Sequence, residues 1–412
     1  MFPVSDRVFA TMVTTVRRMS TGKSSDTYAD IFLARQEHVR KVCNSQGRIV
    51  PDTLINSTIT DRMIIEPEHF IVYCPVEKVA STFWKRTLYT MMSNGRNTSP
   101  YDSGKTEKNG VQIYQTFRKR STGLNIRELK STAESLLVVR DPYVKLFSGY
   151  VDKLFHPNYL FWKVYGERIK RDIRKYDNPN SGLVCGNDIT FSEYVRYIIF
   201  AIHDGIHLNS HFTSITKHCD PCVTKYTYIS KIETLKPDFK YIMNRWNQKH
   251  HLNISIQDWE TEGALQITRL HIKLSFTTLE KFGRICNMRK YLFLQRTWRF
   301  LQISGIVSKH YPLPFIDDVL TAEFVTEDNF VQAVENIIKK QPSWDIVHKQ
   351  RREALIEAYQ SLNEDELMGL REYVLTDCQY FDYNDKPTAL FSRNQTDSGN
   401  ETSDSYKYFD MF

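Results

Sequence analysis

The sequence has few glycines and prolines, no internal repeat and no long apolar run. Of its 412 residues 16 are Gly and 14 are Pro, whereas 13% are aromatic. The low glycine and proline content excludes collagen-like and low-complexity chains, and the aromatic content excludes a wholly disordered one. A chain of this length buries a large core and could hold two or three domains. We therefore expect a globular protein.

There is also no large excess of charge of one sign. The 55 Lys and Arg residues exceed the 48 Asp and Glu residues by a net charge of +7, and acidic residues are interspersed throughout. Nucleic-acid-binding proteins usually concentrate their positive charge on one surface. The balance favours a localised site for a small phosphorylated ligand or an acidic glycan, and no nucleic acid is expected as a partner.

No segment is apolar over the roughly 20 residues that a transmembrane helix needs. The N-terminal segment is interrupted by Arg7, Arg17 and Arg18, and its weakly apolar stretch is too short for a span. We expect a soluble chain, or one that has lost an N-terminal anchor. Sequons for N-glycosylation, which matter only in the secretory pathway, occur at Asn56, Asn97, Asn253, Asn394 and Asn400.

Cysteine is too scarce and too scattered for a scaffold built on disulfides. The seven cysteines are Cys43, Cys74, Cys185, Cys219, Cys222, Cys286 and Cys378. An odd number leaves at least one thiol unpaired in an oxidising compartment. Cys219 and Cys222 form a Cys-x-x-Cys pair, but no second pair exists and His218 is adjacent rather than at ligand spacing. A zinc site is therefore not expected.

Two strand–loop–helix units predict an α/β core. The apolar run from Phe70 to Cys74 is typical of a buried parallel strand, and Trp84 and Leu88 after it recur at helical spacing. Residues 135–139 form a second buried strand, which a helix follows. Two such units favour a central parallel sheet flanked by helices.

The remaining segments carry weaker signals. Residues 1–65 are polar and without sustained periodicity, which predicts a stem or linker before a domain spanning 66–386. Residues 250–340 are mixed and are expected to be a variable, largely helical elaboration. The tail 387–412 is rich in Asn, Ser, Thr and Asp and is predicted to be disordered.

The loop after the first strand has the chemistry of a phosphate site. The N-terminus of the next helix offers backbone N–H groups and a positive dipole end, while Ser81 and Thr82 add hydroxyls and Lys78 a charge. The loop lacks the glycines of a Walker A motif, which disfavours a nucleoside triphosphatase. A simpler interpretation makes Ser81 only a helix cap and Lys78 only a solvated charge.

The second unit places Arg140 at the carboxyl end of its strand, the edge where open α/β sheets bind ligands. Ser148 follows in the next helix, and an arginine fork and a hydroxyl could share one phosphate. The alternative is that Arg140 pairs with Asp141 and that Ser148 faces a neighbouring helix.

Six segments in order resemble the carbohydrate sulfotransferases: EKVASTFWKR, VVRDPYVKLFSGYVDKL, FWKVYGERIKRDIRK, DITFSEYVRYI, NSHFTSITKHCDPC and YTYISKIETLKPDFKYIM. The resemblance is clear from Phe70 to Arg245 and returns faintly in LTDCQYFDYNDKP. These Golgi enzymes, mostly membrane-anchored, use 3′-phosphoadenosine 5′-phosphosulfate (PAPS). The resemblance implies a P-loop-like sulfotransferase fold, sulfuryl transfer to a sugar hydroxyl of a glycan or proteoglycan without a metal, and a place in the Golgi lumen.

The resemblance also implies two groups of donor-binding residues. For the 5′-phosphosulfate these are Lys78, Val79, Ala80, Ser81 and Thr82, and for the 3′-phosphate they are Arg140 and Ser148. A lysine aimed at the bridging oxygen stabilises the charge that develops in the transition state. Remote contacts such as that of Arg140 orient the donor.

An acceptor hydroxyl needs a general base, for which histidine is the usual choice. His211 matches the family's His-Trp position and is our first candidate for the catalytic base. His207 and His203 lie four and eight residues upstream, so that on a helix all three would share a face. A purely structural histidine is the alternative.

The chain departs from the family pattern at three positions. Glu77 stands where a proline commonly precedes the lysine, Lys145 replaces an arginine, and Phe212 replaces a tryptophan. The resemblance further implies that at least one cysteine of the Cys-x-x-Cys pair bonds to a distant partner such as Cys185 or Cys286. A vicinal bridge within the pair is the alternative. The basic clusters Arg118–Arg120 and Lys170–Lys175 are either solvated surface or contacts for an acidic glycan.

Two rival functions stand beside a PAPS-dependent sulfotransferase. A small-molecule kinase also binds phosphate at a strand–loop–helix unit, but it needs Walker glycines and magnesium carboxylates. A non-catalytic glycan-binding relative would keep the sheet and the basic groove but bind the donor poorly. A Glu77 that blocks the donor site would be its signature.

Overall fold

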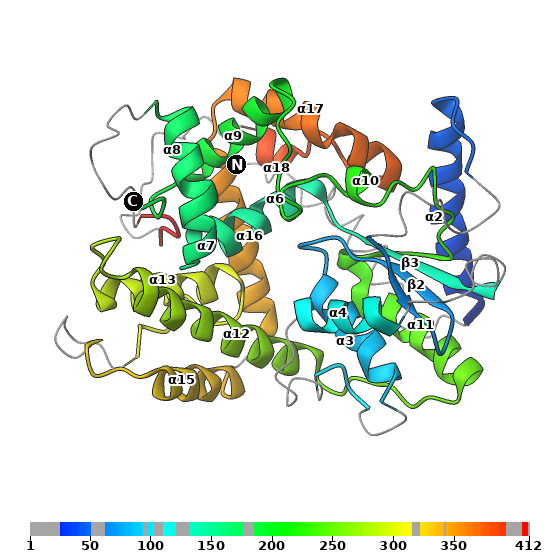
Figure 1. The fold of residues 1–412 in the computed structure, drawn as a ribbon, viewed down its shortest axis with the longest axis horizontal. Helices are drawn as coiled ribbons and strands as arrows, with labels where there is room; N and C mark the ends of the chain where they lie inside the picture. Colours follow the sequence, from blue (N-terminus) through cyan, green and yellow to red (C-terminus); the bar gives the residue numbers. More distant parts are fainter. Residues whose placement is uncertain are drawn as a thin grey trace, which may run out of the picture.

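A mainly parallel sheet lies in one half of the molecule (Figure 1). The computed structural model describes residues 25–50, 62–93, 98–101, 110–120, 132–175, 185–314, 322–341, 343–392 and 406–410. Within these ranges the strands follow the order β1 (Ile64–Glu66), β2 (Ile71–Cys74), β3 (Glu134–Val139) and β4 (Tyr228–Lys231). β1 is antiparallel to β2, whereas β2, β3 and β4 are parallel. The predicted α/β class with a central sheet flanked by helices is confirmed.

The two central strands are apolar on both faces because both faces are covered. β2 is buried along its whole length, and every residue of β3 after Glu134 is buried. Continuous burial of this kind is the mark of a parallel strand between helical layers. The helices of this half are α2 (Ser25–Ser45), α3 (Ser81–Met91), α4 (Gly110–Arg120), η4 (Ile232–Thr234) and α11 (Leu235–His250).

The other half is helical and has its own hydrophobic core. Its shorter elements are α6 (Pro142–Tyr150), η2 (Val151–Phe155), α7 (Tyr159–Phe161), η3 (Trp162–Gly166), α8 (Glu167–Ile173) and α18 (Thr388–Phe391). The short α10 (Ile215–His218) instead buries Ile215 in the core of the sheet half. Its longer helices are α9 (Phe191–His203), α12 (Trp259–Phe282), α13 (Lys290–Ile303), α15 (Glu327–Lys339), α16 (Trp344–Gln360) and α17 (Glu364–Phe381). None of the described helices is long and apolar enough to cross a membrane.

The described parts of the two terminal segments are folded rather than extended. Within 1–65, for which a stem or linker was expected, α2 buries Phe32 and Val39 in the core of the sheet half. Arg35 of α2 donates to Asp238 at 2.7 Å. Within 387–412, predicted to be disordered, Tyr408 is buried against the helical half. Both segments are polar on average and contribute only a few apolar anchors, which is why their composition is misleading.

Three disulfides join distant parts of the chain. Cys43 bonds to Cys222, Cys74 to Cys219, and Cys185 to Cys286, while Cys378 is free and buried. Both cysteines of the Cys-x-x-Cys pair thus have distant partners, but the suggested partners Cys185 and Cys286 bond to each other instead. Cys43 of α2 and Cys74 at the end of β2 lie beside residues 219–222, whereas Cys185 and Cys286 lie beside each other.

Removing the Cys43–Cys222 bond should destabilise the protein. Because this bond closes a sequence separation of 179 residues, it restricts the unfolded chain strongly. We expect the double variant Cys43→Ser, Cys222→Ser to lose about 2–5 kcal/mol of unfolding free energy in denaturant titrations. Cys378→Ala, which breaks no bond, is the control and should cost about 1 kcal/mol. Equal midpoints for the double variant and the wild type would contradict this account.

Candidate active site

The loop between β2 and α3 has an unusual backbone conformation. Lys78 and Ala80 have φ angles of 68° and 60°, in the left-handed region that residues with a side chain seldom adopt. The buried side chain of Val79 lies between them. Ala80 is the N-cap of α3 and has no side-chain oxygen to cap the helix, so Ser81 is the first helical residue and not the cap. The amide groups at this helix end therefore receive no side-chain cap.

Asp152 is the centre of the polar contacts near this loop. It lies in η2, a π-helical turn that continues α6, and its Oδ2 accepts from Lys78 Nζ at 2.6 Å. The same oxygen lies 3.1 Å from Lys153 Nζ, and Oδ1 lies 3.1 Å from His271 Nε2 of α12. Each of these four side chains is at most 16% exposed. Lys78 is therefore not a solvated loop charge.

These charges shift one another's titration. Burial acts to raise the pKa of Asp152, but Lys78, Lys153 and His271 together hold that pKa well below its usual range. Burial also lowers the pKa of Lys78, which Asp152 partly counteracts. The site thus keeps one ionised carboxylate among several bases.

Arg140 is almost fully buried at the end of β3 and does not pair with Asp141. Its guanidinium donates to the backbone oxygen of Lys78 at 3.0 Å, and its Nε is buried without a partner. Asp141 instead accepts from the amide of Val144 as the N-cap of α6. Burial, and next the charge of Arg351 on α16, lower the pKa of Arg140 to about 9. Two neighbouring arginines with an unsatisfied N–H indicate a site for an anion.

Ser148 lies on α6 and is half-buried. Its hydroxyl has no hydrogen-bond partner in the described part of the chain. The same is true of Ser81 and Thr82 at the start of α3. These three hydroxyls are available to a ligand, as predicted candidates, but no contact in the structure tests their role.

His211 lies within the field of the Lys78 group. Its Nδ1 is 2.7 Å from Asn209 Oδ1, which also accepts from the His211 backbone amide at 3.0 Å. Burial, and then the charges of Lys153 and Lys78, lower the pKa of His211 to about 2. The structure therefore brings together the two residues predicted to be catalytic, Lys78 and His211, with His211 in its neutral form.

The prediction that His203, His207 and His211 share one helical face is wrong. Helix α9 ends at His203, and Gly205 follows with a φ of +66°, which a residue with a side chain would adopt only with strain. The chain then continues without helix to Ser214. His207 is exposed and lines a pocket described next, whereas His211 faces the Lys78 group.

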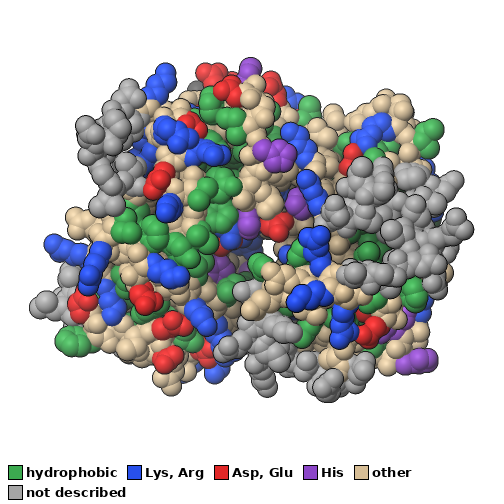
Figure 2. Space-filling view, in the orientation of Figure 1, with side chains coloured by type: hydrophobic (Ala, Val, Ile, Leu, Met, Phe, Trp, Pro, Cys, Tyr) green, Lys and Arg blue, Asp and Glu red, His purple; other side chains and the backbone are tan. Residues whose placement is uncertain are grey.

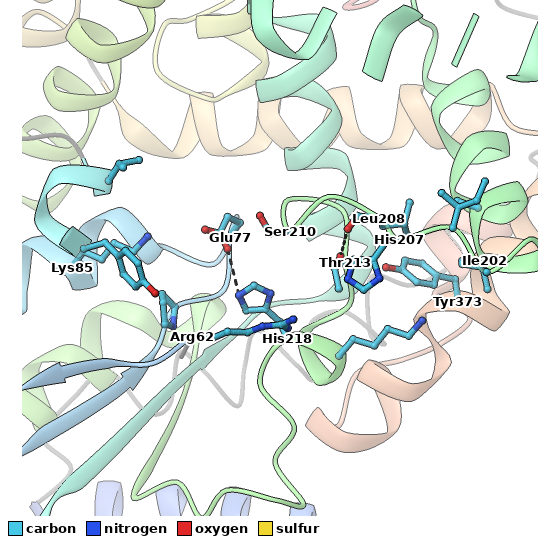
Figure 3. A pocket seen from close by; sticks show the side chains of 17 residues that line it. Arg62, Glu77, Lys85, Ile202, His207, Leu208, Ser210, Thr213, His218 and Tyr373 are labelled. Carbon is cyan, nitrogen blue, oxygen red and sulfur yellow. Dashed lines mark hydrogen bonds and ion pairs between the residues drawn. The ribbon is translucent and has the colours of Figure 1, made fainter. Parts of the chain in front are cut away.

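A pocket of about 750 Å³ lies beside the loop, and Glu77 is on its wall (Figure 3). Glu77 Oε2 is 3.8 Å from His218 Nε2, and no ion pair among the described residues joins Glu77 to Lys78. Lys145 is buried, and its Nζ donates to Thr213 O at 2.6 Å. Phe212 is fully buried in the core of the helical half. Of the three departures from the family pattern, Glu77 is therefore the one that changes the surface of a pocket.

Residues of both basic clusters of the sequence form ion pairs. Arg120 forms an exposed ion pair with Glu68 at 2.7 Å. Lys170 pairs with Asp188 at 2.6 Å, and Arg174 pairs with both Asp188 and Glu193. These contacts favour the interpretation of both clusters as ordinary surface.

Four residues of the site were not singled out from the sequence. Asp152 and Lys153 lie inside the segment VVRDPYVKLFSGYVDKL, where two adjacent charges in an apolar helix were a usable signal. His271 and Arg351 come from α12 and α16, where nothing in the local pattern marks them. Figure 2 shows a hollow between the two halves with Lys, Arg and His side chains on its walls.

A metal site is not seen in the described ranges. They contain no group of three His, Cys, Asp or Glu side chains suited to a metal ion.

His211 should stay neutral in the ligand-free protein over the whole range in which histidines usually titrate. We expect its ring resonances in NMR spectra, assigned with His211→Gln, to show no protonation step from about pH 8 to about pH 4. Because the unfolded chain binds this proton below its ordinary pKa of 6.5, the residue's contribution should lower stability as the pH falls through this range. A midpoint near 6.5 in the folded protein would refute the predicted burial of His211 among cations.

Comparisons with known proteins agree with this geometry. Residues 61–272 match the sulfotransferase family. The chain is 29% identical to human "Carbohydrate sulfotransferase 9" over 215 residues, which are 51% of this chain and 46% of that protein. It is 23% identical to mouse "Carbohydrate sulfotransferase 8" over 285 residues (69% and 64%), and 29% identical to rat "Carbohydrate sulfotransferase 10" over 247 residues (56% and 66%).

The matched region thus spans about half to two thirds of the length of these curated relatives. No solved structure matches the chain. Since the family match covers slightly more than half of the 412 residues, the protein belongs to the sulfotransferase family, and its relatives there are carbohydrate sulfotransferases.

Proposed function

We propose that the protein transfers a sulfuryl group from PAPS to a hydroxyl of a glycan or proteoglycan. One observation carries the proposal. Lys78, Lys153 and Arg140 converge on one loop; among the described residues Asp152 is the only carboxylate that forms an ion pair with them, and Arg140 has a buried N–H without an acceptor. Such an excess of buried positive charge is matched by a ligand with several negative charges.

The residues present fit the two ends of this donor. The uncapped start of α3 and the hydroxyls of Ser81 and Thr82 suit the 5′-phosphosulfate, with Val79 and Ala80 holding the loop in shape. Arg140, Ser148 and the newly identified Arg351 suit the 3′-phosphate. When bound, PAPS supplies a sulfuryl group on a good phosphate leaving group, and the chemistry needs no metal.

Lys78 and His211 have distinct roles in the proposed in-line displacement. Lys78, held by Asp152 in the free protein, donates to the bridging oxygen on which negative charge develops. His211 takes the proton of the acceptor hydroxyl through Nε2, because its Nδ1 is engaged by Asn209. The negative charge of a bound donor offsets Lys78 and Lys153 and so raises the pKa of His211 toward the range of a useful base.

The orientation of Glu77 argues against the non-catalytic alternative. A carboxylate that excluded the donor would have to face Lys78 or Arg140. Glu77 instead faces His218 in the neighbouring pocket (Figure 3). The kinase alternative has no specific observation in its favour.

We also propose that the protein works in an oxidising lumen, that of the Golgi by resemblance. The three disulfides support this location, because such bonds are rare in proteins of reducing compartments. One of the five sequon asparagines, Asn253, lies on the described surface, where its exposed side chain would be open to glycosylation.

Binding of 3′-phosphoadenosine 5′-phosphate (PAP), measured by calorimetry, tests the donor site without knowledge of the acceptor. We expect micromolar binding that ATP does not match, because ATP lacks a 3′-phosphate. Lys78→Ala, Arg140→Ala and Arg351→Ala should each weaken PAP binding by about 10-fold to 100-fold, as expected for lost hydrogen bonds to charged groups.

Lys340→Ala, at the exposed C-cap of α15, is the matched control and should bind PAP like the wild type. Absence of PAP binding in a folded wild-type protein would rule out the donor site. If the three site variants lost affinity for ATP and for PAP to the same extent, the site would instead be a general nucleotide site.

A further inference from the structure

The pocket that contains Glu77 adjoins the proposed catalytic residues on both sides. Pro75 and Glu77 come from the loop that continues to Lys78. Ser210 and Thr213 come from the segment that contains His211. A ligand in this pocket therefore touches Glu77, the residue before the proposed donor-binding Lys78. It also touches Ser210 and Thr213, which flank the proposed base. We refer to it as the Glu77 pocket.

The Glu77 carboxylate lacks a hydrogen-bond donor. Its Oε2 is buried and has no hydrogen-bond partner among the described residues, and His218 Nε2, at 3.8 Å, is too far for a hydrogen bond. Buried polar atoms are nearly always satisfied, so an unsatisfied one on a pocket wall indicates a group that a ligand satisfies. The missing partner is a hydrogen-bond donor such as a hydroxyl.

The rest of the pocket is basic. Among its described lining residues Glu77 is the only acidic one, whereas Arg62, Lys85 and Lys217 are basic. No ion pair within the described part of the chain involves these three side chains. The pocket thus offers one buried carboxylate oxygen and three basic side chains without an ion pair to any described residue, which suits a ligand with a hydroxyl and an anionic group.

The size and the walls of the pocket suit sugar units. A volume of about 750 Å³ lies within the range of small-molecule sites and holds more than one monosaccharide. Tyr114 and Tyr373 give it flat, partly apolar walls, against which sugar rings pack well.

We propose that the Glu77 pocket is an acceptor subsite, in which Glu77 accepts a hydrogen bond from a sugar hydroxyl and Lys85 and Lys217 hold an anionic substituent of the same glycan. This assignment rests on the proposed sulfotransferase function. It makes Glu77 a specificity-determining residue of this chain, because the usual proline would offer the acceptor no hydrogen bond.

The test compares two glycans that differ only in charge. The probes are a tetrasaccharide of alternating hexuronic acid and N-acetylhexosamine and its carboxyl-reduced form, titrated into the full chain by calorimetry with and without PAP. We expect the acidic form to bind about tenfold more tightly, and the double variant Lys85→Met, Lys217→Met to abolish this preference. Glu77→Ala should weaken both forms about tenfold without weakening PAP binding.

Glu280→Ala and Lys340→Met, both exposed and outside the pocket, are the matched controls and should bind both probes like the wild type. Equal affinity of the two probes for the wild type, unchanged binding in the pocket variants, or no binding of either probe would overturn the assignment. PAP binding separates the test of the donor site from the test of the acceptor subsite. Its absence in the wild type would refute the donor site but not the Glu77 pocket. If Glu77→Ala fails to fold, the lysine variant alone decides.

Discussion

The contact of Asp152 with three bases is the interaction on which the site depends. Lys78 belongs to the loop of the sheet half, whereas Lys153 and His271 belong to the helical half. One largely buried carboxylate therefore joins the two halves and keeps mutually repelling charges in place. Removing one partner of such a buried group leaves the others uncompensated, at a cost of about 3–5 kcal/mol. Lys78 is bound to Asp152 in the free protein, and an anionic ligand would compete with Asp152 for this lysine.

The conformation of the loop shows how a chain without Walker glycines could form the proposed phosphate site. Glycine usually supplies the left-handed backbone angles of such loops. Here Lys78 and Ala80 adopt them, and the strain is held by the burial of Val79 between them and by the Cys74–Cys219 bond directly before the loop. The hydrogen bond from Arg140 to the Lys78 carbonyl adds a further restraint from the next strand. Pre-organisation by packing and cross-links thus replaces the freedom of glycine.

Sequence reasoning identified the parts of the site that follow a strand along the chain. Arg140 could be found because it comes directly after a buried strand, and Lys78 and Ser81 because they lie in the loop and helix start that follow one; parallel strands end at one edge of the sheet. His271 and Arg351 could not, because helices far along the chain supply them and only the tertiary fold brings them to that edge. The packing of α2 against the sheet could not be predicted for a similar reason. Its buried Phe32, Val39 and Cys43 form a narrow stripe in a polar segment, and the helix gains its stability from the core and a disulfide rather than from its own pattern.

Burial and, after it, the charges that favour the donor lower the pKa of His211. Lys78 and Lys153 lower this pKa, and they are also the cations that a phosphosulfate would neutralise. In the proposed reaction the strength of the base is therefore coupled to occupancy of the donor site: His211 is a poor proton acceptor in the empty protein and a better one once the negative charge of the donor is present. An acceptor hydroxyl that enters first meets a weak base and no sulfuryl group. The charges around His211 thus favour deprotonation of the acceptor hydroxyl only after the donor has bound, and this coupling needs no conformational change.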